Sequence, residues 1–259
     1  MRKGVVLAGG AGLRLRPLTR VTNKHLLPVW DRPMIDYPVV TLRQIGVEDL
    51  LVVTGGDAAT AGQFIRLLGD GRGHGLRRIE YAYQQGNGGI AAALLLAEEF
   101  AAGDPIVVAL GDNILGGHLR DSDAGYARQG GGARVVLARV ERPGEFGVAE
   151  FSGERLARIV EKPPVPPSDW VVTGFYFYDA EVFDIIRTLT PSARGELEIT
   201  DVNNRYLERG ALEFDRLEDW WCDAGTFASL LEAGRLVRDR GANRLARVAT
   251  AGGRTGDAA

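Results

Sequence analysis

The chain has 259 residues, of which 45% are hydrophobic and 25% are charged, and its formal net charge is −3. This composition excludes a wholly disordered chain, and it provides no overall basic field of the kind that binds nucleic acid through phosphates. No apolar run approaches the roughly 18 residues that span a membrane, and the opening MRKGVVLAGG lacks the cleavage site of a secretory signal.

These features predict one large cytoplasmic domain with neither a nucleic-acid nor a membrane partner. The single cysteine, Cys222, cannot form an internal disulfide, which agrees with a reducing compartment. The three histidines, His25, His74 and His118, lie far apart in the sequence and lack the spacing of zinc ligands.

The first half of the chain alternates short apolar runs with longer segments of helical period, which is typical of an α/β fold. The run IVVAL (106–110) has no polar alternation, so it predicts a parallel sheet that is buried on both faces. Pro38 predicts a distortion inside the first helical segment. We expect strands at 5–8, 49–55, 78–83 and 105–113, and helices at 34–45, 57–68 and 90–100.

Beyond residue 130 the strand candidates are closely spaced and separated by short turns, so we expect the sheet to become mixed. The domain is expected to end near residue 240. Residues 241–259 are rich in Gly, Ala and Arg without any period, and they predict a flexible tail. Strand candidates lie at 133–140, 147–151, 155–163 and 170–179, the segment LEFDRL lies at 212–217, and helices are expected at 180–189, 196–208 and 227–238.

A glycine loop follows the first strand, in the segment LAGGAGLRLRPLTRVTNK (7–24). Gly9, Gly10 and Gly12 let the backbone approach a ligand closely, and the N–H groups of such loops bind phosphates. The Walker pattern does not fit, because Arg14 stands where it requires Gly-Lys. The dinucleotide fingerprint fits poorly, because Leu15 replaces its third glycine. Taken alone, the loop is either an anion site of another class or a tight turn.

Two aspartates are candidate metal ligands. Asp112 follows a buried strand, and open α/β sheets bind ligands at the carboxyl ends of their strands. Asp223 lies in WWCDAGT, where Trp220 and Trp221 flank it. Two carboxylates from distant segments suit Mg²⁺, which takes few protein oxygens and fills its other positions with water and phosphate. From these residues alone, a turn role for Asp112 and a helix N-terminal role for Asp223 stay open.

Ordered sequence blocks extend these observations over residues 4 to about 233. The blocks are LAGGAGLRLRPLT, NKHLLPV, RPMI, YAYQQGNGGIA, LGDNI, EFGVAEF, EKPPVPPSDWVVTGFYFYD, PSARGELEITDVNN and WWCDAGT. With these blocks the chain resembles the sugar-1-phosphate nucleotidyltransferases, and most closely the glucose-1-phosphate thymidylyltransferases. The resemblance implies a Rossmann-like, GT-A-like α/β fold with a central mixed, mostly parallel sheet flanked by helices.

The reaction that the resemblance implies is attack of a sugar-1-phosphate oxygen on the α-phosphorus of a nucleoside triphosphate, with release of pyrophosphate and Mg²⁺ as cofactor. The expected substrates are glucose 1-phosphate and dTTP, with UTP or another sugar 1-phosphate as alternatives. A glycosyltransferase of the same fold is disfavoured, because its D-x-D pair is replaced by Asp112-Asn113-Ile114. A non-catalytic protein that binds nucleotide sugars also stays open.

The resemblance also implies roles for individual residues. Arg14 would contact the β and γ phosphates, Lys24 would lie nearer the α-phosphate, and Lys162 would hold the sugar phosphate, while Arg16 and Arg20 would be ordinary surface charges. Asp112 and Asp223 would hold the metal. The nucleotide would be bound by Gly9, Gly10, Gly12, Gln84 and Gly89, and the sugar phosphate by Asp112, Asn113, Gly147, Glu161, Lys162, Val172 and Arg194.

Three features depart from the family pattern. Leu13 stands where threonine is usual, and His25 stands where glutamine is frequent beside the catalytic lysine. The chain also resembles the short form of the family, so we do not expect the tetramer and the regulatory site of the long form. A homo-oligomer of another kind stays open.

Overall fold

The computed structural model describes residues 2–56, 58–86 and 88–244. The predicted flexible tail therefore lies mostly outside the described residues, in 245–259. Within the described part, no helix combines the length and the apolar character that crossing a membrane requires.

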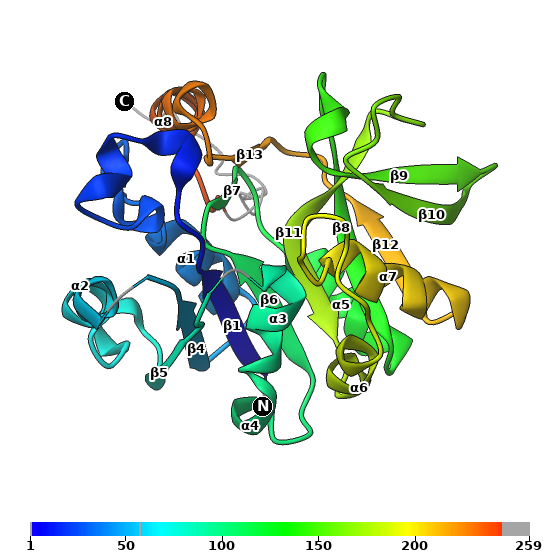
Figure 1. The fold of residues 1–259 in the computed structure, drawn as a ribbon, viewed down its shortest axis with the longest axis horizontal. Helices are drawn as coiled ribbons and strands as arrows, with labels where there is room; N and C mark the ends of the chain where they lie inside the picture. Colours follow the sequence, from blue (N-terminus) through cyan, green and yellow to red (C-terminus); the bar gives the residue numbers. More distant parts are fainter. Residues whose placement is uncertain (1, 57, 87, 245–259) are drawn as a thin grey trace, which may run out of the picture.

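A mixed sheet, with nine strands among the described residues, runs across the molecule from β5 to β10 (Figure 1). At its centre β1 (Lys3–Ala8) pairs in parallel with β4 (Asp49–Thr54) on one side and with β6 (Ile106–Leu110) on the other. β5 (Arg78–Tyr83) continues the parallel part beyond β4. β1, β4 and β6 are almost entirely buried, as the unbroken apolar runs predict.

The second half of the sheet is mainly antiparallel, which confirms the expected change of pattern. β11 (Trp170–Tyr178) pairs antiparallel with β6, with β8 (Ala133–Arg139) and, at one position, with β9 (Gly147–Ser152). β9 forms a hairpin with β10 (Arg155–Glu161), and β12 (Leu212–Arg216) lies parallel to β8.

β11 carries an irregularity that matters for the site. Its register against β8 shifts between Val172 and Tyr176. Within this interval the N–H of Gly174 donates to the side-chain oxygen of Asn113, at 2.8 Å. A Cβ on residue 174 would lie 2.6 Å from Asn113 Cγ, so only glycine leaves room for this contact.

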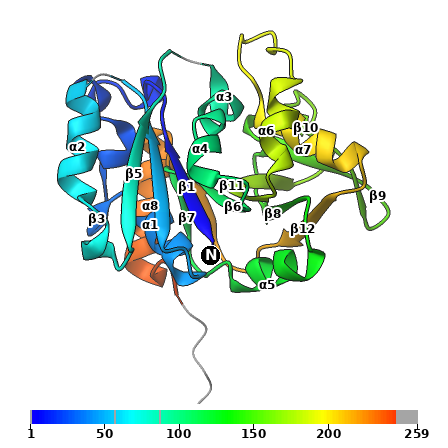
Figure 2. The ribbon, with the colours of Figure 1, turned by 90° about the horizontal axis from the view of Figure 1, so that it is seen from below.

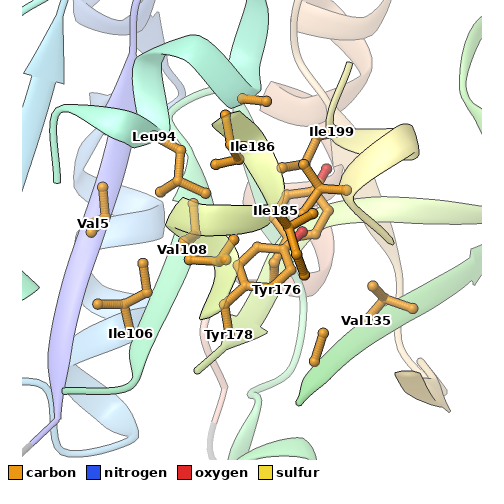
Figure 3. Packing of buried hydrophobic residues seen from close by; sticks show 14 of the residues in the cluster. Val5, Leu94, Ile106, Val108, Val135, Tyr176, Tyr178, Ile185, Ile186 and Ile199 are labelled. Carbon is orange, nitrogen blue, oxygen red and sulfur yellow. The ribbon is translucent and has the colours of Figure 1, made fainter. Parts of the chain in front are cut away.

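One face of the sheet is covered by α3 (Gly89–Leu95), α4 (Glu98–Ala101), α6 (Glu181–Arg187) and α7 (Ile199–Glu208). α3 and α6 lie side by side (Figure 2). Figure 3 shows the core that they form with β1, β6, β8 and β11, which includes Val5, Leu94, Ile106, Val108, Val135, Tyr176, Tyr178, Ile185, Ile186 and Ile199.

The opposite face packs against α1 (Asp36–Gln44), α2 (Ala58–Leu68) and α5 (Arg120–Gln129). α5 is too polar to show a clear apolar period, and the sequence reading did not include it. The side chains that join these helices to the sheet include Val6, Val39, Leu42, Val52, Phe64, Tyr126 and Phe177.

A third, smaller core lies beside the sheet. β7 (Asn113–Leu115) pairs antiparallel with β13 (Trp221–Asp223), and α8 (Phe227–Arg240) packs against β13 and against the hairpin of β2 (Pro28–Val29) and β3 (Arg32–Pro33). This pairing brings together segments that lie about a hundred residues apart in sequence. Short 3-10 turns lie at η1 (Leu13–Leu15), η2 (Leu18–Arg20), η3 (Lys24–Leu26), η4 (Arg72–His74) and η5 (Pro143–Glu145).

Three expected elements differ in detail. α1 begins at Asp36 and runs unbroken to Gln44, so the distortion predicted from Pro38 was wrong: this proline lies in the first turn, where its N–H would have no intrahelical partner. The helix expected at 90–100 is divided, because i→i−3 bonds tighten the last turn of α3. The strand expected at 105–113 ends at Leu110, and Asp112 lies in the turn between β6 and β7.

The contact between Gly174 and Asn113 generates a stability prediction. Gly174→Ala should lower the free energy of unfolding by about 1 to 3 kcal/mol. The added methyl group would collide with the Asn113 side chain, which cannot move aside because hydrogen bonds hold it. Gly62→Ala is the matched control: it lies in α2 with nothing near its missing Cβ, and alanine there should stabilise the helix by about 0.5 to 1 kcal/mol. Urea denaturation measures both, and equal effects of the two substitutions would contradict the packing argument.

Candidate active site

A buried ion pair joins two of the residues that the sequence singled out. Lys24 Nζ donates to Asp112 Oδ2 at 2.5 Å, and both side chains are largely buried. Burial acts to raise the pKa of Asp112, but the charges of Lys24 and His25 and the hydrogen bonds from Lys24 and Asn113 together hold the pKa below its ordinary value. Burial acts to lower the pKa of Lys24, and the charge of Asp112 leaves it raised overall. Both groups are therefore charged at neutral pH.

Asn113 lies beneath Asp112 and orients it. Its side-chain nitrogen donates to Asp112 Oδ1 at 3.0 Å, while its oxygen accepts from the Gly174 N–H and from Trp221 Nε1, at 2.8 and 2.7 Å. Asn113 is only 1% exposed. The resemblance suggested a sugar-phosphate contact for this residue, whereas the described contacts of its side chain fix the carboxylate beside it.

Asp223 reaches the same point from the other end of the chain, because it stands opposite Asn113 in the β7–β13 pair. Its Oδ1 accepts from the Gly225 N–H at 2.8 Å. A Cβ on Gly225 would lie 2.7 Å from Asp223 Oδ1, 3.0 Å from Arg14 Nη2 and 3.5 Å from Asp112 Oδ2. The arginine and both carboxylates therefore converge on this glycine.

The charge of Asp223 is poorly compensated. Burial, and then the neighbouring negative charge of Asp112, raises the pKa of Asp223 to about 6. Among the described residues, no three His, Cys, Asp or Glu side chains are grouped so as to hold a metal ion by themselves. Two adjacent carboxylates instead fit a hard divalent cation such as Mg²⁺, which takes the rest of its ligands from water and phosphate.

The glycine loop packs closely against the lysine. Gly10 and Gly12 have φ values of +91° and +59°, in the left-handed region that favours glycine. A Cβ on Gly12 would lie 2.9 Å from Thr19 Cγ2 and 3.3 Å from Lys24 Cβ, and Thr19 Oγ1 donates to the Gly12 carbonyl at 2.8 Å. The chain therefore folds back on itself so that Gly12 and Lys24 are neighbours.

Two residues after Gly12 project outward. Leu13 is 61% exposed, and the Arg14 guanidinium lies 3.7 Å from the Glu145 carboxylate in η5. This ion pair joins the glycine loop to the turn that precedes β9. Arg14 is thus free to approach a ligand, since both partners of the pair are more than half exposed.

The residues predicted for the nucleotide base lie next to the glycine loop. A Cβ on Gly9 would be 3.0 Å from Gln84 Oε1, and Gln84 Nε2 donates to the Gly89 carbonyl at 3.1 Å. A cavity of about 420 Å³ opens here, lined by Tyr83, Gln84, Gln85, Gly88, Ala92 and Leu96.

Packing within the protein already requires glycine at position 89. Its φ is +89°, and a Cβ would lie 2.6 Å from the Leu197 carbonyl oxygen. The absence of a side chain is therefore required by the segment that leads into α7. The close approach of a base to Gly89 stays a prediction.

A second cluster surrounds Glu161, at the end of β10. Its carboxylate accepts from Thr200 Oγ1 at 2.6 Å and from Arg194 Nη2 at 3.0 Å, and Lys162 Nζ lies 3.6 Å from it. A Cβ on Gly147 would lie 3.0 Å from Thr200 Oγ1, so glycine leaves this cluster open. Four of the predicted sugar-phosphate residues are thus brought together.

Two of the residues predicted to bind the sugar phosphate, Arg194 and Val172, are held by other parts of the protein. Arg194 also pairs with Glu198, at 2.8 Å, and this second carboxylate anchors the arginine to α7. Val172 is buried in the main core, on β11. Its side chain packs into that core, and its sugar-phosphate role stays a prediction.

Sequence patterns did not predict two hydrogen bonds that hold members of the clusters in place, one from Thr200 and one from Trp221. Thr200 and Trp221 hydrogen-bond to Glu161 and Asn113. Hydrogen bonds between distant segments leave no local pattern.

Comparison of the sequence with known proteins identifies relatives over most of the chain. The family model described as Nucleotidyl transferase matches residues 3–240. A relative from Actinoplanes sp., named glucose-1-phosphate thymidylyltransferase, is 48% identical over 239 residues, which cover 91% of this chain and 78% of the relative. A protein of the same name from Mycobacterium tuberculosis is 43% identical over 240 residues, with coverage of 91% and 82%.

Solved structures of nucleotide-sugar enzymes have the same fold. A putative glucose-1-phosphate thymidylyltransferase from Bacillus anthracis, in complex with sucrose, superimposes with a TM-score of 0.88 at 46% identity, covering 92% of this chain and 96% of that chain. A UDP-glucose pyrophosphorylase complexed with UDP-glucose is 23% identical with a TM-score of 0.82, and it shows a shared fold alone. The convergence of the glycine loop, Lys24 and the two aspartates is thus found in a chain that belongs to the nucleotidyl transferase family.

Proposed function

We propose that the protein transfers a thymidylyl group from dTTP to glucose 1-phosphate, giving dTDP-glucose and pyrophosphate. The observation that carries the proposal is the buried Lys24–Asp112 pair beside Asp223, with the glycine loop on one side and the Glu161 cluster on the other. The names of the relatives supply the substrates. Such substrates also fit a cytoplasmic location, which stays a prediction, as does the way in which subunits associate.

In this reaction an oxygen of the sugar phosphate forms a bond to the α-phosphorus, and the bond to the leaving pyrophosphate breaks. No protein nucleophile is needed, so the contribution of the protein is alignment and charge stabilisation. Asp112 and Asp223 would hold Mg²⁺, which when bound neutralises phosphate charge and orients the reacting groups.

The cations have distinct roles in the proposal. The Lys24 ammonium has three donors, so it can hold Asp112 and also donate to an α-phosphate oxygen. Arg14 is exposed at the mouth of the glycine loop, where it can bind the outer phosphates. Lys162 lies beside Glu161, where a cation can hold the sugar phosphate while the carboxylate accepts from sugar hydroxyls.

Pyrophosphate release tests the proposal directly. The purified protein should release pyrophosphate when dTTP, glucose 1-phosphate and Mg²⁺ are all present, and omission of any one of them should abolish the signal. A panel with UTP and other hexose 1-phosphates measures base and sugar preference. If none of these combinations releases pyrophosphate, the proposed reaction is wrong, and calorimetry that shows binding without turnover would favour a binding protein.

The central ion pair predicts large kinetic effects. Asp112→Asn and Lys24→Ala should each lower kcat by on the order of a hundredfold or more, because each removes a preorganised electrostatic contact. The matched control is Lys3→Ala, which breaks an ion pair of 2.9 Å with Asp104 at the opposite end of β1. The control should keep kcat within about twofold. Near-normal turnover of either site variant would remove the role assigned to that residue.

Asp223 predicts an effect on stability that depends on pH. Its folded-state pKa of about 6 lies above the ordinary value of 3.8, so the folded state favours the protonated form and loses stability as pH rises from about 4 to 6. Asp223→Asn should therefore raise the free energy of unfolding of the metal-free protein at pH 7.5 by on the order of 2 kcal/mol. Below about pH 4 the gain should vanish.

Urea denaturation at pH 7.5 and 4.0, with a chelator present, measures this difference. The control is Asp219→Asn, in the same segment, where two arginines compensate the carboxylate. This control should give no stabilisation. An Asp223→Asn variant that is less stable than the wild type at pH 7.5 would show that the carboxylate is not strained in the absence of metal.

A further inference from the structure

We propose that His25 is a positioning residue that holds Lys24 and the Asp112 turn in register from inside the protein, without touching substrate; this inference rests on the proposed function. His25 follows the lysine directly in η3 and is only 2% exposed. Its carbonyl accepts from the Ile35 N–H at 2.9 Å, which ties the turn to the start of α1.

The imidazole ring of His25 leaves no room for a side chain on Gly111, the residue that precedes Asp112. A Cβ on Gly111 would lie 2.7 Å from His25 Cδ2 and 3.2 Å from both Cγ and Nε2. The ring therefore occupies the space over this glycine, and the Gly111 N–H in turn donates to the Leu7 carbonyl in β1 at 2.9 Å. The position of the Asp112 backbone is thus limited by the ring on one side and by β1 on the other.

The Nδ1 atom of the ring holds the side chain of Asn23, the residue that precedes Lys24. His25 Nδ1 lies 2.7 Å from Asn23 Oδ1, and the same oxygen accepts from the His25 N–H at 3.0 Å. Asn23 Nδ2 donates to the carbonyl of Ala8, the last residue of β1, at 3.3 Å. Since Asn23 Oδ1 is an acceptor, His25 Nδ1 carries the proton and donates.

These contacts place the His25 side chain against the chain neighbours of both members of the ion pair. Asn23 and His25 flank Lys24 and are bonded to each other, while the ring packs on Gly111, the neighbour of Asp112. The Lys24–Asp112 distance thus depends on the shape of the ring and on its hydrogen bonds to Asn23 and to the Ala8 backbone. Displacements of about 1 Å in such a contact cost up to a hundredfold in rate.

The choice of residue is informative. Glutamine, which the resemblance makes frequent at this position, can donate a hydrogen bond to Asn23 but has no ring to cover Gly111. His25→Gln therefore keeps one half of the arrangement, and His25→Ala removes both. The positioning role predicts an order of effects, in which the alanine variant is impaired more than the glutamine variant.

Steady-state kinetics with pyrophosphate detection test this order. We expect His25→Ala to lower kcat about tenfold or more, with KM for both substrates changed less than about threefold, and His25→Gln to recover part of kcat. Asn23→Ala combined with His25→Ala should be no worse than His25→Ala alone, since both act through one network. The control is Thr22→Val, in the same loop as His25, which loses a hydrogen bond of 2.8 Å to Gln63 in α2 and should keep kcat.

A second readout does not depend on activity. In the metal-free protein, hydrogen exchange should accelerate in both segments 20–27 and 108–114 in His25→Ala, and in neither segment in Thr22→Val. This holds even if the wild type proves inactive on dTTP, a result that would overturn the proposed function alone. If His25→Ala does not fold, His25→Gln supplies the same comparisons. A kcat within twofold of the wild type, or faster exchange confined to 20–27, would overturn the positioning role.

Discussion

The ion pair between Lys24 and Asp112 lies where the parallel and antiparallel halves of the sheet meet, and its geometry depends on most of the surrounding structure. The segment that leaves β1 brings the lysine, and the turn that leaves β6, the neighbour of β1, brings the aspartate. Because both charges are largely buried, separation would leave each without compensation. The glycine loop, the Asn113 amide and the β7–β13 pair all limit that separation.

Two buried acids, Asp49 in the main sheet and Asp223 in the β7–β13 pair, differ in how their charge is balanced. Asp49, at the start of β4, is 1% exposed and is paired with Arg77 and Arg78, so its charge is balanced within the chain. Asp223 is held by the Gly225 N–H and by the more distant charges of Lys24 and Arg14, and its pKa is raised. Incomplete compensation of this kind is typical of a functional site, where a ligand completes the charge balance at some cost to the stability of the free protein.

Local patterns in the sequence predicted the features that neighbouring residues determine. The buried strands, the glycine loop and the position of Asp112 at a strand end follow from apolar runs and from the geometry of parallel sheets. The meeting of Asp112 with Asp223 could be expected only from the family resemblance, because the β7–β13 pair joins distant segments. The hydrogen bonds of Asn113 escaped prediction for the same reason, and α5 did so because its face toward the sheet is small.

Asn113 and Gly174 share one volume, and this restricts how the two positions can change. A larger residue at 174 would require a smaller one at 113, which would remove the donor to Asp112 and the acceptor for Trp221. A smaller residue at 113 alone would leave the Gly174 N–H buried without a partner. Each single substitution is therefore unfavourable, and a joint substitution that restores the packing still removes the bonds to Asp112 and Trp221, so the two positions constrain each other.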